Sequence, residues 1–165
     1  EKKQKTDNDP SGILAACRIQ NYLFIYHAQK VWKEFPDLMR FIPEYVRAHG
    51  YDDRSTIRIE PKANGKSVVQ QARKATKLNV TETPSPADSK SVRLKTRSPK
   101  IECGRVILVE GDWNEEFVTE VSQFPAATHD EYVDILVYAI DYLLGDDGNE
   151  ITDDDIKEIL SAFGC

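Results

Sequence analysis

Cysteine is scarce in this sequence of 165 residues, and the three present, Cys17, Cys103 and Cys165, are far apart and form no CxxC pair. Neither a zinc site nor a disulfide framework is therefore indicated. Long hydrophobic runs are also missing: the longest unbroken one, ILVYAI, has 6 residues, far fewer than the roughly 20 of a membrane-spanning helix. Nothing resembles a secretory signal. We therefore expect an intracellular protein with no membrane partner.

Basic residues are almost absent from the last third of the chain. Residues 110–165 contain 1 Lys or Arg against 16 Asp and Glu, whereas residues 1–109 contain 21 against 12. The net charge of -6 hides this segregation. A basic region attracts polyanions, and an acidic region repels them or collects cations. For the last 20 residues a solvated acidic tail is the simpler interpretation.

What the sequence does contain is an alternation of strand and helix patterns. Two strand patterns, 13–19 and 22–31, meet at the polar pair Gln20 and Asn21 and predict an antiparallel hairpin. Strand–helix–strand crossings follow, so the predicted fold class is α/β with a mixed sheet. Further strands are expected at 55–61, 78–84 and, at a sheet edge, 105–109; helices are expected at 36–50, 64–77, 85–104, 113–124, 127–144 (the longest) and 151–160.

The stretch ATHDEYVDILVYAIDYLL combines a core helix with an unusually charged start. Its apolar residues form one stripe, Val133, Leu136, Val137, Ile140 and Leu144. On a helical wheel Asp130 and Asp134 border that stripe, and Glu131 lies further round. Acids at a helix start are favoured by the helix dipole. The spacing alone therefore leaves two interpretations open, a solvated helix start and half of a metal site.

A second carboxylate ends a predicted strand. In TIRIEPKANG, Glu60 follows the alternating Ile57 and Ile59. In open α/β sheets, ligands bind at the carboxyl ends of strands. The alternative is a surface turn in which Glu60 pairs with Lys62.

Two nucleotide- and cation-binding motifs are excluded. NGKS is similar to the end of a phosphate-binding loop, but the first glycine of that motif would fall at Glu60, so ATP binding is not expected here. The run DDGNEITDDDIKEIL resembles a calcium loop, but the motif then begins at Leu144 and has Asn149 in place of its glycine.

Basic side chains gather in the segment SKSVRLKTRSPK and after Glu60. Such clusters suit contacts with phosphates, which position nucleic acid without reading its sequence. A solvated helix face is the alternative. The candidates are Lys62, Lys66, Lys90, Arg93 and Arg97.

Together these stretches resemble the C-terminal nuclease domain of the large terminase subunit of tailed bacteriophages, in the RNase H-like superfamily. IRIEPKANGKSVVQQAR is similar to the acid-bearing strand and following helix of that family, and FVTEVSQFPAATHDEYVDILVYAIDYL to its closing motif of acids. The hairpin segment TDNDPSGILAACRIQNYLFIYHAQKVWKEFPDL and the segment SKSVRLKTRSPKIECGRVILVEGDW extend the resemblance over most of the chain. It implies a three-layer RNase H-like fold with a mixed central sheet flanked by helices.

The resemblance implies metal-dependent cleavage of double-stranded DNA. Two Mg²⁺ or Mn²⁺ ions would be held by carboxylates, which are hard oxygen donors. Glu60 corresponds to the family's second acid, and the third comes from the group Asp130, Glu131 and Asp134, where Glu131 replaces the usual Asp. Asn64, Gly65 and His129 are expected to support the site.

The family's first acid has no counterpart, because Asp7 and Asp9 lie in a predicted turn. We therefore expect a chain cut after its first strand, with weak or absent activity. On this interpretation residues 1–145 form the nuclease domain and residues 146–165 an acidic helical tail. The expected partners are double-stranded DNA, an upstream ATPase motor domain of the same polypeptide, the phage portal and the small terminase subunit, in the host cytoplasm.

Two alternatives remain. Another RNase H-like nuclease, such as a junction resolvase, would place similar acids on its closing helix. A chain that lacks one acid can also fold as a DNA-binding or capsid-docking module that does not cut.

Overall fold

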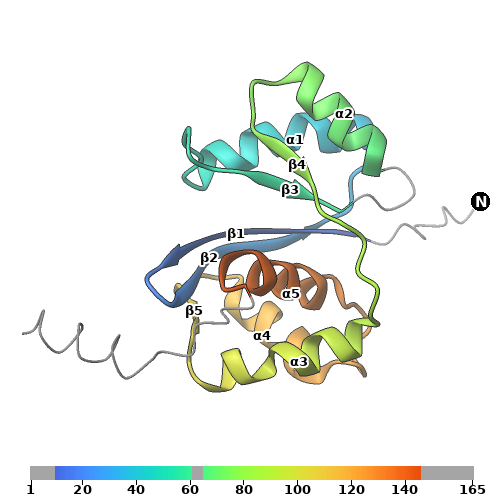
Figure 1. Cartoon of the computed structure of the whole chain (residues 1–165). Helices are drawn as coiled ribbons and strands as arrows, with labels where there is room; N and C mark the ends of the chain where they lie inside the picture. Colours follow the sequence, from blue (N-terminus) through green and yellow to red (C-terminus); the bar gives the residue numbers. More distant parts are fainter. Residues whose placement is uncertain (1–9, 61–64, 146–165) are drawn as a thin grey trace, which may run out of the picture.

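The computed structural model describes residues 10–60 and 65–145, in which strands and helices alternate along the chain (Figure 1). The described elements, in chain order, are β1 (Ser11–Ile19), β2 (Tyr22–Val31), α1 (Phe35–Ala48), β3 (Ile57–Ile59), α2 (Gly65–Ala75), β4 (Val80–Glu82), α3 (Lys90–Glu102), β5 (Val106–Leu108), α4 (Asn114–Gln123) and α5 (Glu131–Leu143). The expected α/β class is confirmed. The predicted acidic tail, 146–165, and the turn residues Asp7 and Asp9 lie outside the described ranges.

The main sheet has the strand order β1-β2-β5. β1 and β2 pair antiparallel, and β5 adds to β2 in parallel. The hairpin turns at Gln20, whose φ of 54° lies in the left-handed region. The sequence predictions of a hairpin, a mixed sheet and an edge position for the strand at 105–109 are thus confirmed.

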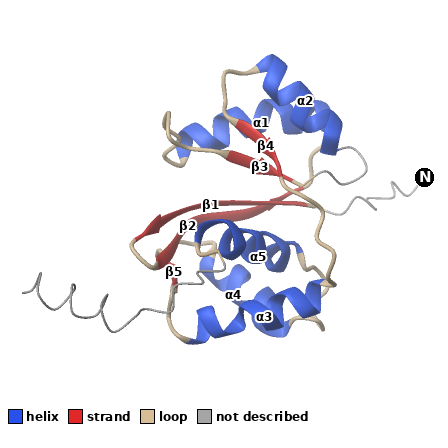
Figure 2. Ribbon diagram, viewed as in Figure 1, coloured by secondary structure: helices blue, strands red, loops and turns tan. Residues whose placement is uncertain are grey.

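β3 and β4 form a second sheet of two parallel strands, joined by the crossover helix α2. We had expected these strands in the central sheet, and the structure places them in a sheet of their own. β1 pairs only with β2, so no strand in the described part of the chain links β1 to β3 or β4. Figure 2 shows α1 and α2 beside this small sheet, and α3, α4 and α5 on the other side of the long hairpin.

Each sheet has its own hydrophobic core. The larger one joins the hairpin to α4 and α5 through residues such as Leu23, Ile25 and Phe117. The smaller one, around Val69, Ala72 and Val80, joins α2 to β3 and β4. The predicted apolar stripe of α5 is confirmed, because all five of its members are buried, namely Val133, Leu136, Val137, Ile140 and Leu144.

The start and length of α5 differ from the prediction. The helix begins at Glu131 rather than near residue 127, because residues 124–128 form turns and bends and residues 129–130 are irregular. It has 13 residues and α1 has 14, so α5 is not the longest helix. Its first turn comes close to β1 at Gly12, where an added Cβ would lie 3.2 Å from Glu131 Cβ. The absence of a side chain at Gly12 therefore permits this close approach.

None of the helices within the described ranges has the length and hydrophobicity that crossing a bilayer requires.

Candidate functional site

Polar side chains follow one edge of the apolar stripe of α5. Asp134, Tyr138 and Asp141 are spaced by about one helical turn each. Asp130 precedes them as the N-cap residue, although its side chain makes no capping hydrogen bond. Asp134 is only 7% exposed. Burial of a carboxylate costs free energy unless the charge is paired. The partners of Asp134 are therefore needed to interpret this row of side chains.

The facing row of side chains lies on α3, which packs against α5. α3 begins after Ser89, whose Oγ accepts a hydrogen bond from the Val92 amide at 3.4 Å and caps the helix. Basic residues then recur every three or four positions and so share one side of the helix. They are Lys90, Arg93, Arg97 and Lys100.

Lys90 lies where oxygen atoms of two aspartates converge. Its Nζ is 2.5 Å from Asp130 Oδ1 and 2.7 Å from Asp134 Oδ2. It also donates to the backbone oxygen of Asp130 at 3.4 Å. Burial alone would lower the pKa of Lys90, but the hydrogen bonds to Asp130 and Asp134 raise it above its ordinary value. Lys90 therefore remains a cation held by two carboxylates.

Arginines continue the pairing along the two helices. Arg93 Nη2 donates to Asp134 Oδ1 at 2.9 Å, and both side chains are about nine-tenths buried. Arg97 Nε donates to Asp141 Oδ1 at 2.5 Å. Both carboxylate oxygens of Asp134 thus bind a cation, one Lys90 and the other Arg93. Such a pair of buried contacts fixes the orientation of the Asp134 carboxylate.

Glu60 joins this face of α5 from the end of β3. The pKa of the Tyr138 hydroxyl is raised by burial first and by the nearby Glu60 carboxylate second, with Arg93 and Asp134 also close enough to act on it. Tyr138 lies one turn beyond Asp134. The sequence-predicted acids Glu60 and Asp134 are therefore neighbours of one tyrosine, although β3 does not belong to the main sheet.

Glu131 and His129 lie on a different side of the start of α5. The Cβ of Glu131 is directed toward β1 at Gly12, and its Oε2 is 3.7 Å from His129 Nδ1, an ion pair only when the histidine is protonated. The His129 ring stands edge-on to Trp32, with 6.2 Å between centroids. Asp130 and Asp134 thus converge, and Glu131 does not join them.

The oxygen atoms around Lys90 fit one hard divalent cation. Two carboxylate oxygens and a backbone carbonyl already surround a single positive charge, and Mg²⁺ and Mn²⁺ prefer such donors. Within residues 10–60 and 65–145 no group of three or more His, Cys, Asp or Glu side chains is close enough to hold a metal. That Asp130 and Asp134 bind a metal ion stays a prediction.

The predicted DNA-binding residues fall into two groups. Lys90, Arg93 and Arg97 are brought together on α3, where they pair with acids of α5. Lys62 lies outside the described residues, and Lys66 lies at the start of α2. That the five basic residues contact DNA stays a prediction. Of the residues expected to support the site, Asn64 lies outside the described ranges and Gly65 begins α2.

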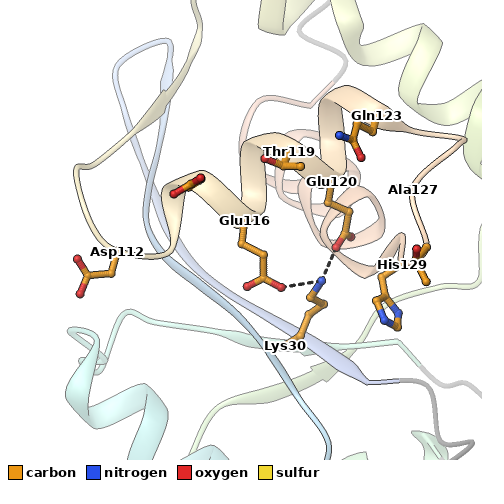
Figure 3. Close-up of a pocket in the computed structure, with 10 residues that line it drawn as sticks. Lys30, Asp112, Glu116, Thr119, Glu120, Gln123, Ala127 and His129 are labelled. Carbon is orange, nitrogen blue, oxygen red and sulfur yellow. Dashed lines mark hydrogen bonds and ion pairs between the residues drawn. The ribbon is translucent and has the colours of Figure 1, made fainter.

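A second lysine between two carboxylates was not predicted from the sequence. Lys30 Nζ is 2.6 Å from Glu120 Oε2 and 2.8 Å from Glu116 Oε1. The lysine and both glutamates line a cavity of about 460 Å³ beside α4, and His129 lines it next to Lys30 (Figure 3). A signal was present: on a wheel, Glu120 lies next to the apolar Phe117 and Val121. We call Lys30, Glu116 and Glu120 the Lys30 cluster, and we call Lys90, Asp130 and Asp134 the Lys90 cluster.

Comparison with known protein families gives one match. The model of a family described as "Terminase RNaseH-like domain" matches residues 38–143. The matched segment includes β3, α3 and α5 and thus every residue of the Lys90 cluster. No curated protein matches the chain.

Proposed function

Because the chain belongs to the terminase RNase H-like domain family, we propose that it is a metal-dependent endonuclease domain that cuts concatemeric double-stranded DNA during packaging of a phage genome. The supporting observation is the convergence of Asp130 and Asp134 on one positive charge. Membership of the family supports a nuclease-type module. The position of the Lys90 ammonium between the two aspartates supports a cation-binding site there.

Asp130 and Asp134 would hold a divalent metal, and Glu60 would contribute from the end of β3. Mg²⁺ or Mn²⁺, when bound, supplies Lewis-acid chemistry for phosphodiester hydrolysis. Glu131 remains in the proposed set of acids. Because its Cβ lies close to Gly12 of β1 and its Oε2 lies 3.7 Å from His129 Nδ1, we assign it to a position apart from Asp130 and Asp134.

The basic residues of α3 have two tasks in this proposal. Arg93 is a positioning residue, since its contact with buried Asp134 fixes the direction of that carboxylate. Lys90 balances the charge of Asp130 and Asp134. With Asp130 and Asp134 engaged as metal ligands, the Lys90 ammonium would contact a DNA phosphate instead of the two carboxylates. Phosphate contacts carry no base information, so we expect little sequence specificity from this domain.

The proposed partners follow from the same family membership. They are double-stranded DNA, an ATPase motor domain of the same polypeptide, the phage portal and the small terminase subunit. The motor and portal would bring DNA to the nuclease site.

Incubation of supercoiled plasmid with the chain and Mn²⁺ tests the nuclease proposal. We expect slow, metal-dependent nicking and linearisation that is lost in Glu60→Gln and in Asp134→Asn. Glu116→Gln is the matched control, because it removes one carboxylate charge from the Lys30 cluster. Circular dichroism of each variant verifies that it is folded.

Three outcomes are informative. Binding of DNA with neither Mn²⁺ binding by the chain nor any metal-dependent cleavage would contradict the nuclease proposal and support a DNA-binding or capsid-docking module. Cleavage confined to four-way junctions would instead support a resolvase. Fast cleavage by this chain would show that its first acid is not missing.

A further inference from the structure

A second pocket lies between β3, α3 and α5, close to the Lys90 cluster. It has a volume of about 400 Å³ and is closed on one side by the connection at residues 83–88. Three arginines from two elements line it, Arg58 of β3 and Arg93 and Arg97 of α3. Two tyrosines of α5, Tyr138 and Tyr142, complete the wall. Arginines together with aromatic rings are the side chains that recognise phosphate groups.

Arg93 lacks acceptors for part of its guanidinium. One nitrogen, Nη2, donates to Asp134, but Nε and Nη1 are buried and have no hydrogen-bond partner in the described structure. The side chain is 9% exposed. Buried charged donors without acceptors are unfavourable, so this arginine is suited to an additional anionic acceptor beside Asp134.

Within residues 10–60 and 65–145, Arg58 contacts the ring of Tyr142 and forms no ion pair with an acidic side chain. Its guanidinium carbon lies 3.7 Å from the centroid of the Tyr142 ring. A guanidinium stacked on a ring keeps its charge and leaves its N–H edge available for an anion. Both side chains are exposed, so an approaching polyanion can reach them.

The charges around the pocket leave Arg58 and the unpartnered side of Arg93 as its anion-seeking groups. Arg97 is neutralised by Asp141, which also lines the pocket. Asp88, in the connecting segment, is the other acid of the wall. Asp134 beside Arg93 and Glu60 beside Tyr138 are the acids next to the pocket. Arg58 and the unpartnered side of Arg93 are therefore the groups among the lining residues that can bind an anion.

We infer that this pocket seats a phosphate group of the DNA backbone, with Arg58 at its mouth and Arg93 at its base. The inference rests on the proposed function and adds a binding site to it. Because Arg93 also contacts Asp134, the seated phosphate would lie next to the carboxylates rather than between them. Arg58 is then a DNA-positioning residue outside the group of acids.

Binding of a short fluorescein-labelled DNA duplex without divalent cations, measured by anisotropy over a range of salt concentrations, tests this site. Arg58→Ala is expected to weaken binding several-fold and to reduce the slope of log K against log salt by about 0.9, the value for one lost phosphate contact. Two unrelated duplex sequences should be affected equally. Arg58→Lys keeps the charge and should keep most of the slope.

Arg54→Ala is the matched control, because Arg54 is an exposed arginine that pairs with Asp52 and does not line the pocket. Wild-type binding together with an unchanged slope in Arg58→Ala would overturn the phosphate site and leave the nuclease proposal standing. An equal change of slope in Arg54→Ala would also overturn the site. A wild-type chain that binds no duplex would overturn the proposed function, and the phosphate site with it.

Discussion

The Lys30 and Lys90 clusters have the same design and different surroundings. In each, one lysine contacts two carboxylates four residues apart, Glu116 and Glu120 or Asp130 and Asp134. The Lys30 side chain is 6% exposed, whereas that of Lys90 is 21% exposed. The ammonium of Lys30 is therefore less accessible to solvent than that of Lys90. We expect a dissolved cation to displace Lys90 from its carboxylates more readily than Lys30.

The neighbours of the two clusters differ as well. In the Lys30 cluster, Glu120 also accepts the backbone amide of Tyr132 at 2.7 Å, and Glu116 accepts the Tyr132 hydroxyl at 3.1 Å. These contacts tie α4 to the first turn of α5. The Lys90 cluster has instead Arg93 and the pocket beside it. The Lys30 cluster therefore joins two helices, whereas our proposal assigns the metal site to the Lys90 cluster.

The largest expected difference between the two clusters is the effect on nuclease activity of removing one carboxylate charge. Asp134→Asn is expected to reduce Mn²⁺-dependent plasmid nicking by about 100-fold or more, because a metal ligand is weakened. Glu116→Gln should leave the nicking rate within about twofold. The rates are compared at equal concentrations of folded protein, and an equal loss in both variants would contradict the assignment.

The free energy of unfolding should be more sensitive to loss of an acid from the Lys30 cluster than from the Lys90 cluster. Glu120→Ala leaves buried Lys30 without its best partner and should lower the free energy of unfolding by about 3 kcal/mol. Asp130→Ala removes a half-exposed carboxylate and should cost under about 1 kcal/mol. Urea denaturation followed by fluorescence measures both. A larger loss for Asp130→Ala would remove the distinction between the clusters.

Metal affinity should rise when the internal cation is removed. Lys90→Gln is expected to strengthen Mn²⁺ binding about tenfold, because the ion no longer competes with an ammonium for Asp130 and Asp134. Lys95→Gln, on an exposed position of the same helix, is the control for net charge. Isothermal titration calorimetry gives the Mn²⁺ dissociation constant of each variant. Weaker Mn²⁺ binding by Lys90→Gln than by the wild type would mean that Lys90 does not compete with the metal.

The smallest expected effect is the pH dependence of the Lys30 cluster. The pKa of Glu116 is lowered from its ordinary 4.5, chiefly by the hydrogen bond from Lys30. A lowered pKa means that the contribution to stability is complete above 4.5 and is lost as the pH falls through the folded-state value. Glu116→Gln should therefore flatten the stability curve below pH 4.5, and an unchanged curve would refute the pairing in solution.

Local pattern predicted much of this molecule. The hairpin turn at Gln20, the apolar stripe of α5 and the basic side of α3 are all properties of short segments, because helix and strand periods can be seen in the sequence. The wheel also placed Asp130 and Asp134 beside that stripe, but it left the choice among Asp130, Glu131 and Asp134 open.

The remaining features depend on contacts between distant segments. The pairing of Arg93 with Asp134 spans 41 residues, and that of Lys30 with Glu120 spans 90. Strand pairing is equally non-local, which is why the separate sheet of β3 and β4 was not predicted. The late start of α5 reflects the turns after Phe124, which oppose the helical pattern of 127–130.

Titration of Mn²⁺ into two double variants tests the central distinction most directly. Asp130→Asn/Asp134→Asn should abolish metal binding, and Glu116→Gln/Glu120→Gln, measured at a temperature where circular dichroism shows it folded, should bind Mn²⁺ as the wild type does. Retained binding in the first variant, or loss only in the second, would contradict the assignment of the metal to the Lys90 cluster.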